Sequence, residues 1–445
     1  MQIQTDQVEK TQLALKKAKQ ALINYALVGA DINVGRSGKF GFLPCPDYTN
    51  ALNEGFQDGN CGATNTNIVG WLPNVTLGLP RLRDSTGTCL LYAVSGAYKQ
   101  SPETSMLNED TNGQFQIVDD SAIPIPIQGV LPADRIVAIV FAPSKVLTGQ
   151  ARTFAAGSDC GEDYGNVTAY LEGDGVTNNA VLNGAADSID QFIRFTPTSD
   201  EEANPYNDNF ITITREELWT AINARNDFTE KMTDLTEALA WCLSAYVNNG
   251  VLADDKRMPW PAPIMLSDYR INSEYDDEED RYAGRFPFLV DSSNVETNLV
   301  VANIFDSVGC ESLNLISGTV VNLSDFNTEY RRLWENWKDH FFYALSSKFD
   351  PKSGNTNCGG SCIDVDGTQY AGVVFFGGSR LGNITRNAPP IDTDDKNDVS
   401  NYLENGNDTE INTAVGDNTD IYTLNTTNDI MFCLSDAVPP VVALC

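Results

Sequence analysis

Ten cysteines are the residues of this 445-residue chain whose chemistry is easiest to interpret. Their number is even, they are scattered, and none falls in the paired CxxC spacing of a zinc site. The only histidine is His340, which nearly excludes a Cys/His metal centre. Disulfide bonds in an exported protein fit this pattern best. The sequence leaves the connectivity open, and the first pairs to expect are Cys45 with Cys61, Cys358 with Cys362, and Cys433 with Cys445.

Acidic loops offer a second kind of chemistry, the binding of calcium. Aspartate, asparagine and backbone carbonyls supply the hard oxygen ligands that calcium prefers. Such loops read "EGDG" (172–175), "EYDDEED" (274–280), "DVDG" (364–367) and "DTDDKND" (392–398), and none satisfies the twelve-residue EF-hand pattern. In the last loop, Lys396 stands where a ligand would be needed. If calcium binds, the best candidate ligands are Asp364, Asp366, Asp392, Asp394 and Asp398, and no other cofactor is expected.

Catalytic residues are harder to identify. Nucleophilic catalysis needs a base beside a serine or cysteine. The single imidazole belongs to His340, which lies in "WKDHFFYAL". A histidine packed in the core, or one that caps a helix, is the better interpretation of this residue. No GxSxG, HExxH, Walker or GxGxxG pattern occurs in a supporting context. The two carboxylates of a glycosidase can meet from anywhere in a fold, and nothing in the sequence points to such a pair. Trp334 and Trp337 are three residues apart on a predicted helix, and this spacing fits packing in the protein core better than stacking on a sugar ring. We therefore predict that the protein is not an enzyme.

The charge balance narrows the range of partners. Asp and Glu number 61 against 29 Lys and Arg, which gives a net charge of −32. Such a surface repels nucleic acid and anionic membranes, so neither is an expected partner. It favours solubility, cation binding or life in salty water, and a solvated acidic surface is the simplest interpretation. No long apolar run and no signal peptide occur, so we expect the export signal of an oxidised protein to lie ahead of residue 1.

Two amphipathic helices must position these residues. Residues 5–27 carry apolar side chains at three- and four-residue steps, and Thr5 or Asp6 could cap that helix. Residues 227–250 repeat the pattern, and an Asn-Asn-Gly sequence marks the end of the helix. A shift of 217 positions superimposes Met232, Leu235, Leu239 and Cys242 on Leu15, Ala18, Leu22 and Tyr25. The two helices therefore share a register.

Further blocks recur in the same order along both halves. The matched segments are 42–47 with 257–263, 91–99 with 342–350, 138–152 with 372–386, and 166–175 with 398–407. Five blocks, the helix included, indicate two tandem copies that cover roughly 1–223 and 224–445. Short buried strands are predicted at 135–143 and 370–378, and a half-exposed strand at 209–214. A helix packed on an antiparallel sheet with long loops, an α+β fold used twice, is the simplest architecture.

The first copy resembles a known family in the run from its helix through "LPCPD" (43–47) to "GWLPNVTLGLPRLRDSTGTCLLYAVS" (70–95). This block is similar to the type IV pilin-like proteins, among them minor pilins and the pseudopilins of type II secretion systems. The match covers about 100 residues, and the second copy matches more faintly. In "LPCPD", the two prolines fix an extended exit from the helix. The second copy has Trp260 in place of Cys45, so we expect packing to replace a crosslink there.

The resemblance implies a stalk helix over 1–31, a pilin-like module over 32–223 and its duplicate over 224–445. It implies an N-terminal signal and an apolar helix half ahead of residue 1, which anchor the protein in the membrane before assembly. We expect a non-enzymatic minor pilin or pseudopilin of the cell surface or an extracellular filament. Its size favours the filament tip, with roles in assembly initiation and adhesion. Other pilin subunits would bind through the N-terminal helix, and the surface or glycan ligand stays unknown. The alternative is a secreted carbohydrate-binding or glycan-active protein on a pilin-like stalk.

Overall fold

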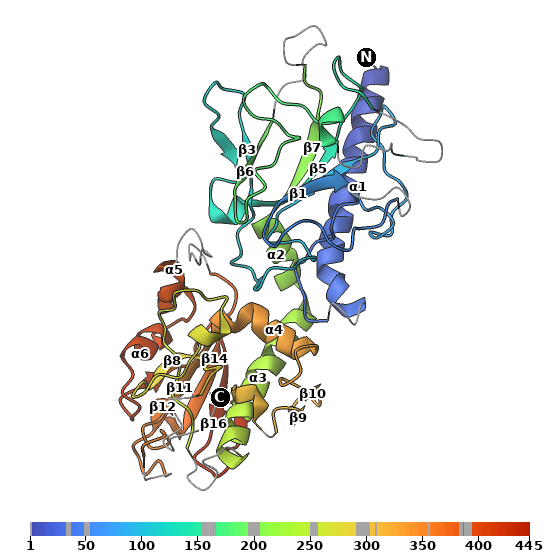
Figure 1. The fold of residues 1–445 in the computed structure, drawn as a ribbon. Helices are drawn as coiled ribbons and strands as arrows, with labels where there is room; N and C mark the ends of the chain where they lie inside the picture. The colour runs from blue at the N-terminus through green and yellow to red at the C-terminus, as the bar shows by residue number, and fades with distance from the viewer. Residues whose placement is uncertain are drawn as a thin grey trace. The chain divides into compact units, whose positions relative to one another are not determined.

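The computed structural model shows an α+β protein made of two compact units (Figure 1). Unit 1 comprises residues 1–36 and 40–222, and unit 2 comprises residues 37–39 and 223–445. The sequence analysis places the module boundary between residues 223 and 224, and these module bounds stay a prediction. The structure describes residues 2–32, 37–48, 54–152, 160, 166–194, 205–249, 257–290, 303–307, 309–353, 357–381, 386 and 394–445.

Unit 1 contains a long helix, a seven-stranded sheet, a short helix and two 3-10 turns among its described residues. These elements are α1 (Gln2–Ile32), β1 (Ile68–Trp71), β2 (Leu91–Val94), β3 (Phe115–Val118), β4 (Pro126–Gln128), η3 (Pro132–Asp134), β5 (Ile136–Ala142), η4 (Val167–Ala169), β6 (Asp190–Ile193), β7 (Asn209–Thr214) and α2 (Arg215–Asn223). The sheet order is β1-β2-β5-β3-β4, with β7 on β5 and β6 on β3.

Unit 2 repeats the plan of a helix and a sheet. Its larger elements are α3 (Asn226–Asn249), β8 (Ala283–Arg285), α4 (Glu329–Trp337), β11 (Phe341–Leu345), β14 (Gly372–Phe376), α5 (Asp394–Asn397), α6 (Asn407–Thr413), β16 (Ile430–Leu434) and β17 (Val442–Leu444). Smaller ones are η5 (Asn272–Glu274), η6 (Ile304–Asp306), β9 (Leu313–Asn314), β10 (Val320–Val321), η7 (Lys338–His340), β12 (Ile363–Val365), β13 (Thr368–Tyr370), η8 (Val399–Asn401) and β15 (Ile421–Tyr422). The main sheet has the order β17-β16-β14-β11-β8.

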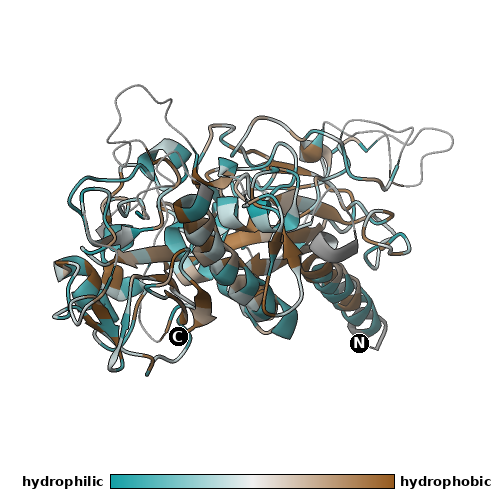
Figure 2. Ribbon diagram, turned by 90° about the horizontal axis from the view of Figure 1, so that it is seen from below, coloured by the Kyte–Doolittle hydropathy of each residue, from teal (hydrophilic) through white to brown (hydrophobic). Residues whose placement is uncertain are grey.

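Each long helix buries one face on its sheet. In α1, the fully buried residues Leu15, Ala18 and Leu22 recur at helical spacing, and the helix packs on β5 and β7. The equivalent helix α3 packs on β14, β16 and β17. Hydrophobic residues gather on the strands, while loops and outer helix faces are largely hydrophilic (Figure 2). Among the described residues, no helix offers a stretch long and hydrophobic enough to span a lipid bilayer.

The central strands of the two sheets pair in the same register. In unit 1, Tyr92 of β2 lies opposite Val140 of β5 in an antiparallel pair. In unit 2, Tyr343 of β11 lies opposite Val374 of β14, also antiparallel. These are the positions that the two matched sequence blocks superimpose. The four residues therefore occupy equivalent places in two strand pairs of the same register.

The flanking strands extend this equivalence on both sides. Val140 also pairs with Ile211 of β7, and Val374 pairs with Phe432 of β16, so the last strand of each core takes the same place. On the other side, β1 lies against β2, and β8 lies against β11, again antiparallel. Each unit thus contains a four-stranded antiparallel core of the same strand order, β1-β2-β5-β7 and β8-β11-β14-β16.

A prolyl segment lies along the first strand of each core. Asp47 pairs with Trp71 at the end of β1, and Ala262 pairs with Arg285 at the end of β8. Both segments follow a Pro-x-Pro sequence, at residues 44–46 and 259–261. In unit 2, Trp260 is fully buried with its ring edge-on to Tyr282, as packing in place of a crosslink requires.

Two expectations about the fold are wrong in detail. The helix does not start at Thr5 or Asp6, because α1 begins at Gln2 and both residues lie inside it. The residues before Thr5 have ordinary helix propensity, so nothing stops the helix there. The sheet of unit 1 is mixed, since β3 and β6 run parallel. The long connection between these strands allows the crossover that a parallel pair needs.

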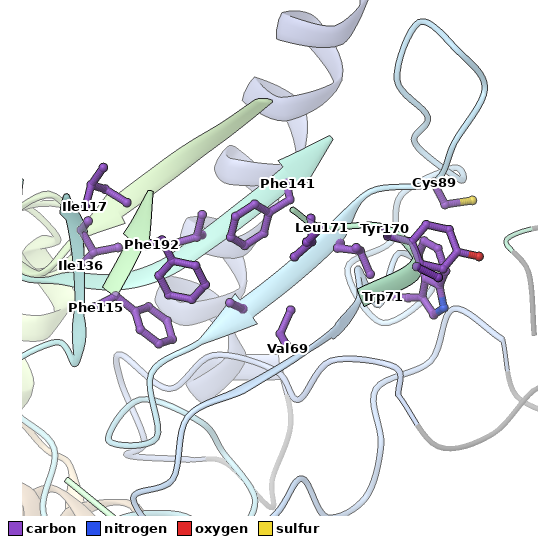
Figure 3. Close-up of a cluster of buried hydrophobic side chains, with 14 of the residues drawn as sticks. Val69, Trp71, Cys89, Phe115, Ile117, Ile136, Phe141, Tyr170, Leu171 and Phe192 are labelled. Carbon is purple, nitrogen blue, oxygen red and sulfur yellow. The ribbon is translucent and has the colours of Figure 1, made fainter. Parts of the chain in front are cut away.

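The core of unit 1 lies on the sheet face that carries aromatic side chains (Figure 3). Phe115 and Phe192 meet edge to face with ring centroids 5.1 Å apart. At the other end, Trp71 of β1 meets Tyr170, which follows η4, with centroids 4.7 Å apart. Rings in this arrangement stabilise a core beyond their buried area. The Tyr170 contact fixes the turn that carries the polar groups described next.

Candidate functional site

Each unit buries a polar cluster at equivalent positions. In unit 1 it consists of Arg152, which follows β5, Tyr170 and Glu172, which follow η4, and Asp208, which precedes β7. In unit 2 the corresponding residues are Arg386, Tyr402, Glu404 and Asp429. The matched sequence blocks superimpose the first three members of each set, and the β7 and β16 register superimposes the aspartates.

In unit 1 an arginine and an aspartate hold the turn after η4. The guanidinium of Arg152 lies over the ring of Tyr170 at 4.8 Å and donates to the carbonyls of Ala169 and Ser144, at 2.9 Å each. The carboxylate of Asp208 accepts from the backbone N–H of Glu172 at 3.0 Å. The cluster therefore ties β7, η4 and the loop after β5 together.

Unit 2 uses the same contacts. The guanidinium of Arg386 lies over the ring of Tyr402 at 5.0 Å. The carboxylate of Asp429 accepts from the backbone N–H of Glu404 at 3.1 Å. In both units an arginine therefore lies over a tyrosine ring, and an aspartate accepts from the backbone N–H of a glutamate.

Burial is the main electrostatic influence on these acids. It raises the pKa of Asp208 well above its usual range, and the neighbouring Glu172 carboxylate raises it further. Burial likewise raises the pKa of Asp429 to about 7. Burial also raises the pKa of Glu172, the neighbour of Asp208. Both carboxyl groups therefore hold a proton more readily than exposed ones do.

A surface pocket of about 310 Å³ lies beside the cluster of unit 1. Its lining includes the cationic residues Arg83, Lys145 and Arg152, the hydroxyls of Thr86 and Thr88, and the disulfide between Cys89 and Cys160. Cations and hydroxyl donors around one hollow suit an anionic group such as a carboxylate or sulfate. This local positive charge contrasts with the acidic balance of the whole chain.

A buried aspartate shapes the rim of this pocket. Asp84 has no exposed surface, and one of its oxygens accepts from the backbone N–H groups of Thr86 and Thr88, at 2.9 and 3.0 Å. Its other oxygen accepts from the N–H of Ser144 at 2.8 Å. Asp84 therefore joins the 84–88 turn to the loop after β5, which is a positioning role for the aspartate of the "LPRLRD" sequence.

The aspartates proposed as calcium ligands are spread over several turns. Asp364 accepts from Gly367 N–H in the β12–β13 turn, Asp366 accepts from Leu424 N–H, and Asp398 caps η8 through Ser400 N–H. Asp394 opens α5, and Asp392 lies outside the described residues. Among the described residues, these carboxylates form no group of three donor atoms within 4.8 Å of one another. Calcium binding stays a prediction.

The structure pairs the ten cysteines into five disulfides, which confirms that disulfide bonds are present. Three of them are the pairs that short spacing indicated, Cys45–Cys61, Cys358–Cys362 and Cys433–Cys445. The other two, Cys89–Cys160 and Cys242–Cys310, span 71 and 68 residues. No local sequence pattern indicates these long pairings, and Cys242 occupies an apolar position in the helical pattern of residues 227–250.

The aromatic residues around the histidine form part of the core. His340 is fully buried, and its Nδ1 lies 2.9 Å from the carbonyl oxygen of Gly377. Trp334 and Trp337 lie on α4 and are buried. The carboxylate clusters described above were missed from sequence, because their members come from segments far apart in the chain. The duplication offered the one usable signal, since Arg152, Tyr170 and Glu172 recur in the second copy.

No family model, no curated protein and no solved structure matches this chain.

Proposed function

We propose that this chain consists of two tandem pilin-like modules and acts as a non-enzymatic minor pilin or pseudopilin. It would sit at the tip of a filament, where it initiates assembly and mediates adhesion. The observation that carries the proposal is the long N-terminal helix on an antiparallel core, present twice with the same strand order and register. The sequence block around "LPCPD" and "LGLPRLRD" links this architecture to the pilin-like family.

Duplication supports the modular part of the proposal. Independent folds rarely share strand order, pairing register and a buried Arg-Tyr-Glu-Asp cluster at once. Here all three features recur, and the helices pack on equivalent strands. A gene segment copied in tandem accounts for them together. A doubled globular part is hard to stack in a filament shaft, which is why we place the protein at a tip.

The N-terminal helix is the proposed contact with other pilin subunits. Its residues 6–10 are exposed, and the apolar side chains of Val8 and Leu13 are 62% and 55% exposed. Exposed aliphatic side chains on an amphipathic helix are suited to packing against another helix. The five disulfides fit a protein that works outside the cell, on its surface or in an extracellular filament.

Double substitution of Val8→Glu and Leu13→Glu tests this contact. We expect the variant to keep the thermal stability of the wild type and to lose co-purification with filament subunits from the producing cell. Val176→Glu is the matched control, because Val176 is equally exposed at 62% and lies outside the helix. Immunogold labelling should place the wild-type protein at filament ends. Label along the whole shaft, or full assembly by the double variant, would overturn the proposal.

A second candidate is a secreted carbohydrate-binding or glycan-active protein on a pilin-like stalk. The pocket lined by Arg83, Lys145 and Arg152 favours it, since these cations suit the carboxylate or sulfate groups of acidic sugars. A glycan array with a hydrolysis assay separates the two candidates. Turnover that disappears when one aspartate or glutamate is changed would favour the glycan-active protein. Glycan binding without hydrolysis would instead favour a non-enzymatic protein that adheres to glycans through this pocket.

A further inference from the structure

A disulfide joins two segments of unit 1 that lead into its core. Cys89 lies two residues before β2, and its partner Cys160 lies seven residues before η4. The bond therefore joins the segment that precedes β2 to the segment that precedes η4, the turn before Tyr170 and Glu172. In unit 2 the equivalent elements are β11 and η8, and the residue that corresponds to Cys89 is His340.

In unit 2, a lysine and an aspartate connect the segments that precede β11 and η8. Asp339 lies two residues before β11, and Lys396, which interrupts the acidic run 392–398, lies three residues before η8. The Nζ of Lys396 contacts Oδ2 of Asp339, and neither side chain has any exposed surface.

We propose that Lys396 and Asp339 form an intramolecular isopeptide bond, the covalent counterpart in unit 2 of the Cys89–Cys160 disulfide. A buried ion pair is an inefficient way to join two segments, because desolvation of the charges offsets much of their attraction. An amide between the same side chains removes both charges and keeps the connection. The inference does not depend on the proposed function.

One arginine holds both reacting residues in place. The guanidinium of Arg285 donates through Nη1 to the carbonyl oxygen of Asp339 and through Nη2 to that of Lys396. Arg285 is itself fully buried, with its guanidinium 4.9 Å from the ring centroid of Tyr269. Fixed backbones limit the motion of the two side chains. Groups held in this way can react as if at effective concentrations of roughly 10⁵ M or more.

A tyrosine hydroxyl is placed to assist the reaction. Tyr402 Oη donates to Oδ2 of Asp339 at 3.3 Å and lies 3.5 Å from Nζ of Lys396. Its ring, 6.0 Å from Nζ, and the ring of Tyr269, 5.7 Å from Nζ, enclose the lysine tip. A hydroxyl that contacts both partners can polarise the carboxyl group and carry a proton between them.

The atoms and charges balance without a cofactor. In the proposed reaction, the ammonium of Lys396 first passes a proton to the carboxylate of Asp339, which gives a neutral amine and a carboxylic acid. The amine nitrogen then attacks Cγ of Asp339, a C–N bond forms and a C–O bond breaks. One water molecule leaves with a carboxyl oxygen and two of the three ammonium protons. The product is an uncharged amide, and no group is oxidised or reduced.

Mass spectrometry of the full chain decides the question. After reduction and alkylation of the ten cysteines, we expect the intact wild-type protein to be lighter than its sequence mass by one water molecule. Proteolysis should yield one branched peptide that joins the segments around Asp339 and Lys396. The Lys338–Glu335 pair, in contact at 3.4 Å with Glu335 23% exposed, is the internal control and should appear on unlinked peptides.

Two variants separate the amide from a simple ion pair. Lys396→Arg keeps the positive charge but cannot form the bond, so its mass should equal the sequence mass. Tyr402→Phe should leave a larger unlinked fraction if the hydroxyl carries the proton. A wild-type chain at its full sequence mass, with the two segments on separate peptides, would overturn the proposal. This outcome needs no variant and therefore holds even if a substitution prevents folding.

Discussion

Asp208 and Asp429 each precede the strand that completes a four-stranded core, and each lies beside a glutamate. Their Oδ1 atoms are buried without a hydrogen-bond partner in the part of the chain that the structure describes. A proton on the aspartate would let that oxygen donate, which is what a raised pKa provides. We therefore expect these two carboxyl groups to bind a proton more tightly in the folded protein than in the unfolded chain.

The sign of the resulting pH dependence follows from linkage. The pKa of Asp429 is about 7 in the folded protein, whereas an aspartate in an unfolded chain titrates near about 3.9. Its contribution to stability is therefore fully present below about pH 4 and is lost as the pH rises to 7. We expect the free energy of unfolding of unit 2 to fall over this range by at most roughly 4 kcal/mol. The urea midpoint of unit 2 should fall with it.

Asp429→Asn should flatten that pH dependence, because the amide is neutral at every pH. Urea denaturation at a series of pH values measures the slope. Asp417→Asn is the control, since hydrogen bonds from Thr419 lower the pKa of Asp417, and its titration lies below the tested range. Equal slopes for the wild type and Asp429→Asn would contradict the role assigned to this carboxyl group.

Two glycines occupy the same point of both cores, where the prolyl segment lies against the first strand. An added Cβ at Gly70 would lie 2.9 Å from the carbonyl oxygen of Asp47, and one at Gly284 would overlap that of Ala262. We expect Gly70→Ala and Gly284→Ala to destabilise their units by about 1–3 kcal/mol each. Gly59→Ala is the control, because nothing lies within 4 Å of its added Cβ. Chemical denaturation measures all three.

At the scale of elements, covalent links set how firmly each segment is held. Cys89 and Cys160 close a loop of 71 residues, whereas Cys358 and Cys362 close one of 4. A crosslink restricts the unfolded chain more when its loop is longer. Replacing Cys89 and Cys160 by serine should therefore cost about 4 kcal/mol, against about 2 kcal/mol for Cys358 and Cys362. Thermal denaturation of the two double variants compares them, and an equal loss would contradict the loop-length argument.

Elements with a local pattern could be predicted from the sequence, and those assembled from distant segments could not. The 3.6-residue spacing of Leu15, Ala18 and Leu22 identifies α1, and the apolar run 136–142 identifies β5. The parallel pairing of β3 with β6 and the meeting of Glu172 with Asp208 depend on tertiary contacts without a sequence period. The acidic loops predict a calcium site, and the structure adds that Asp398 and Asp364 accept hydrogen bonds within their turns.

At the scale of the whole molecule, two units with separate cores should unfold separately. Each unit has its own helix, sheet and disulfides, and no disulfide joins the two. We expect calorimetry of the full chain to resolve two transitions, and residues 223–445 expressed alone to give one of them. A single transition, together with an unfolded C-terminal fragment, would show that unit 2 needs unit 1 to fold.

The two units of this molecule share the pairing register of their central strands. A substitution at Tyr92 has a structural counterpart at Tyr343, so the same change can be compared in two backgrounds within one polypeptide, at one concentration and in one solvent. The two substitutions can then be compared by the change in unfolding free energy that each causes. Because the strand pairing is the same at both positions, a difference between the two changes reports the effect of the surrounding side chains.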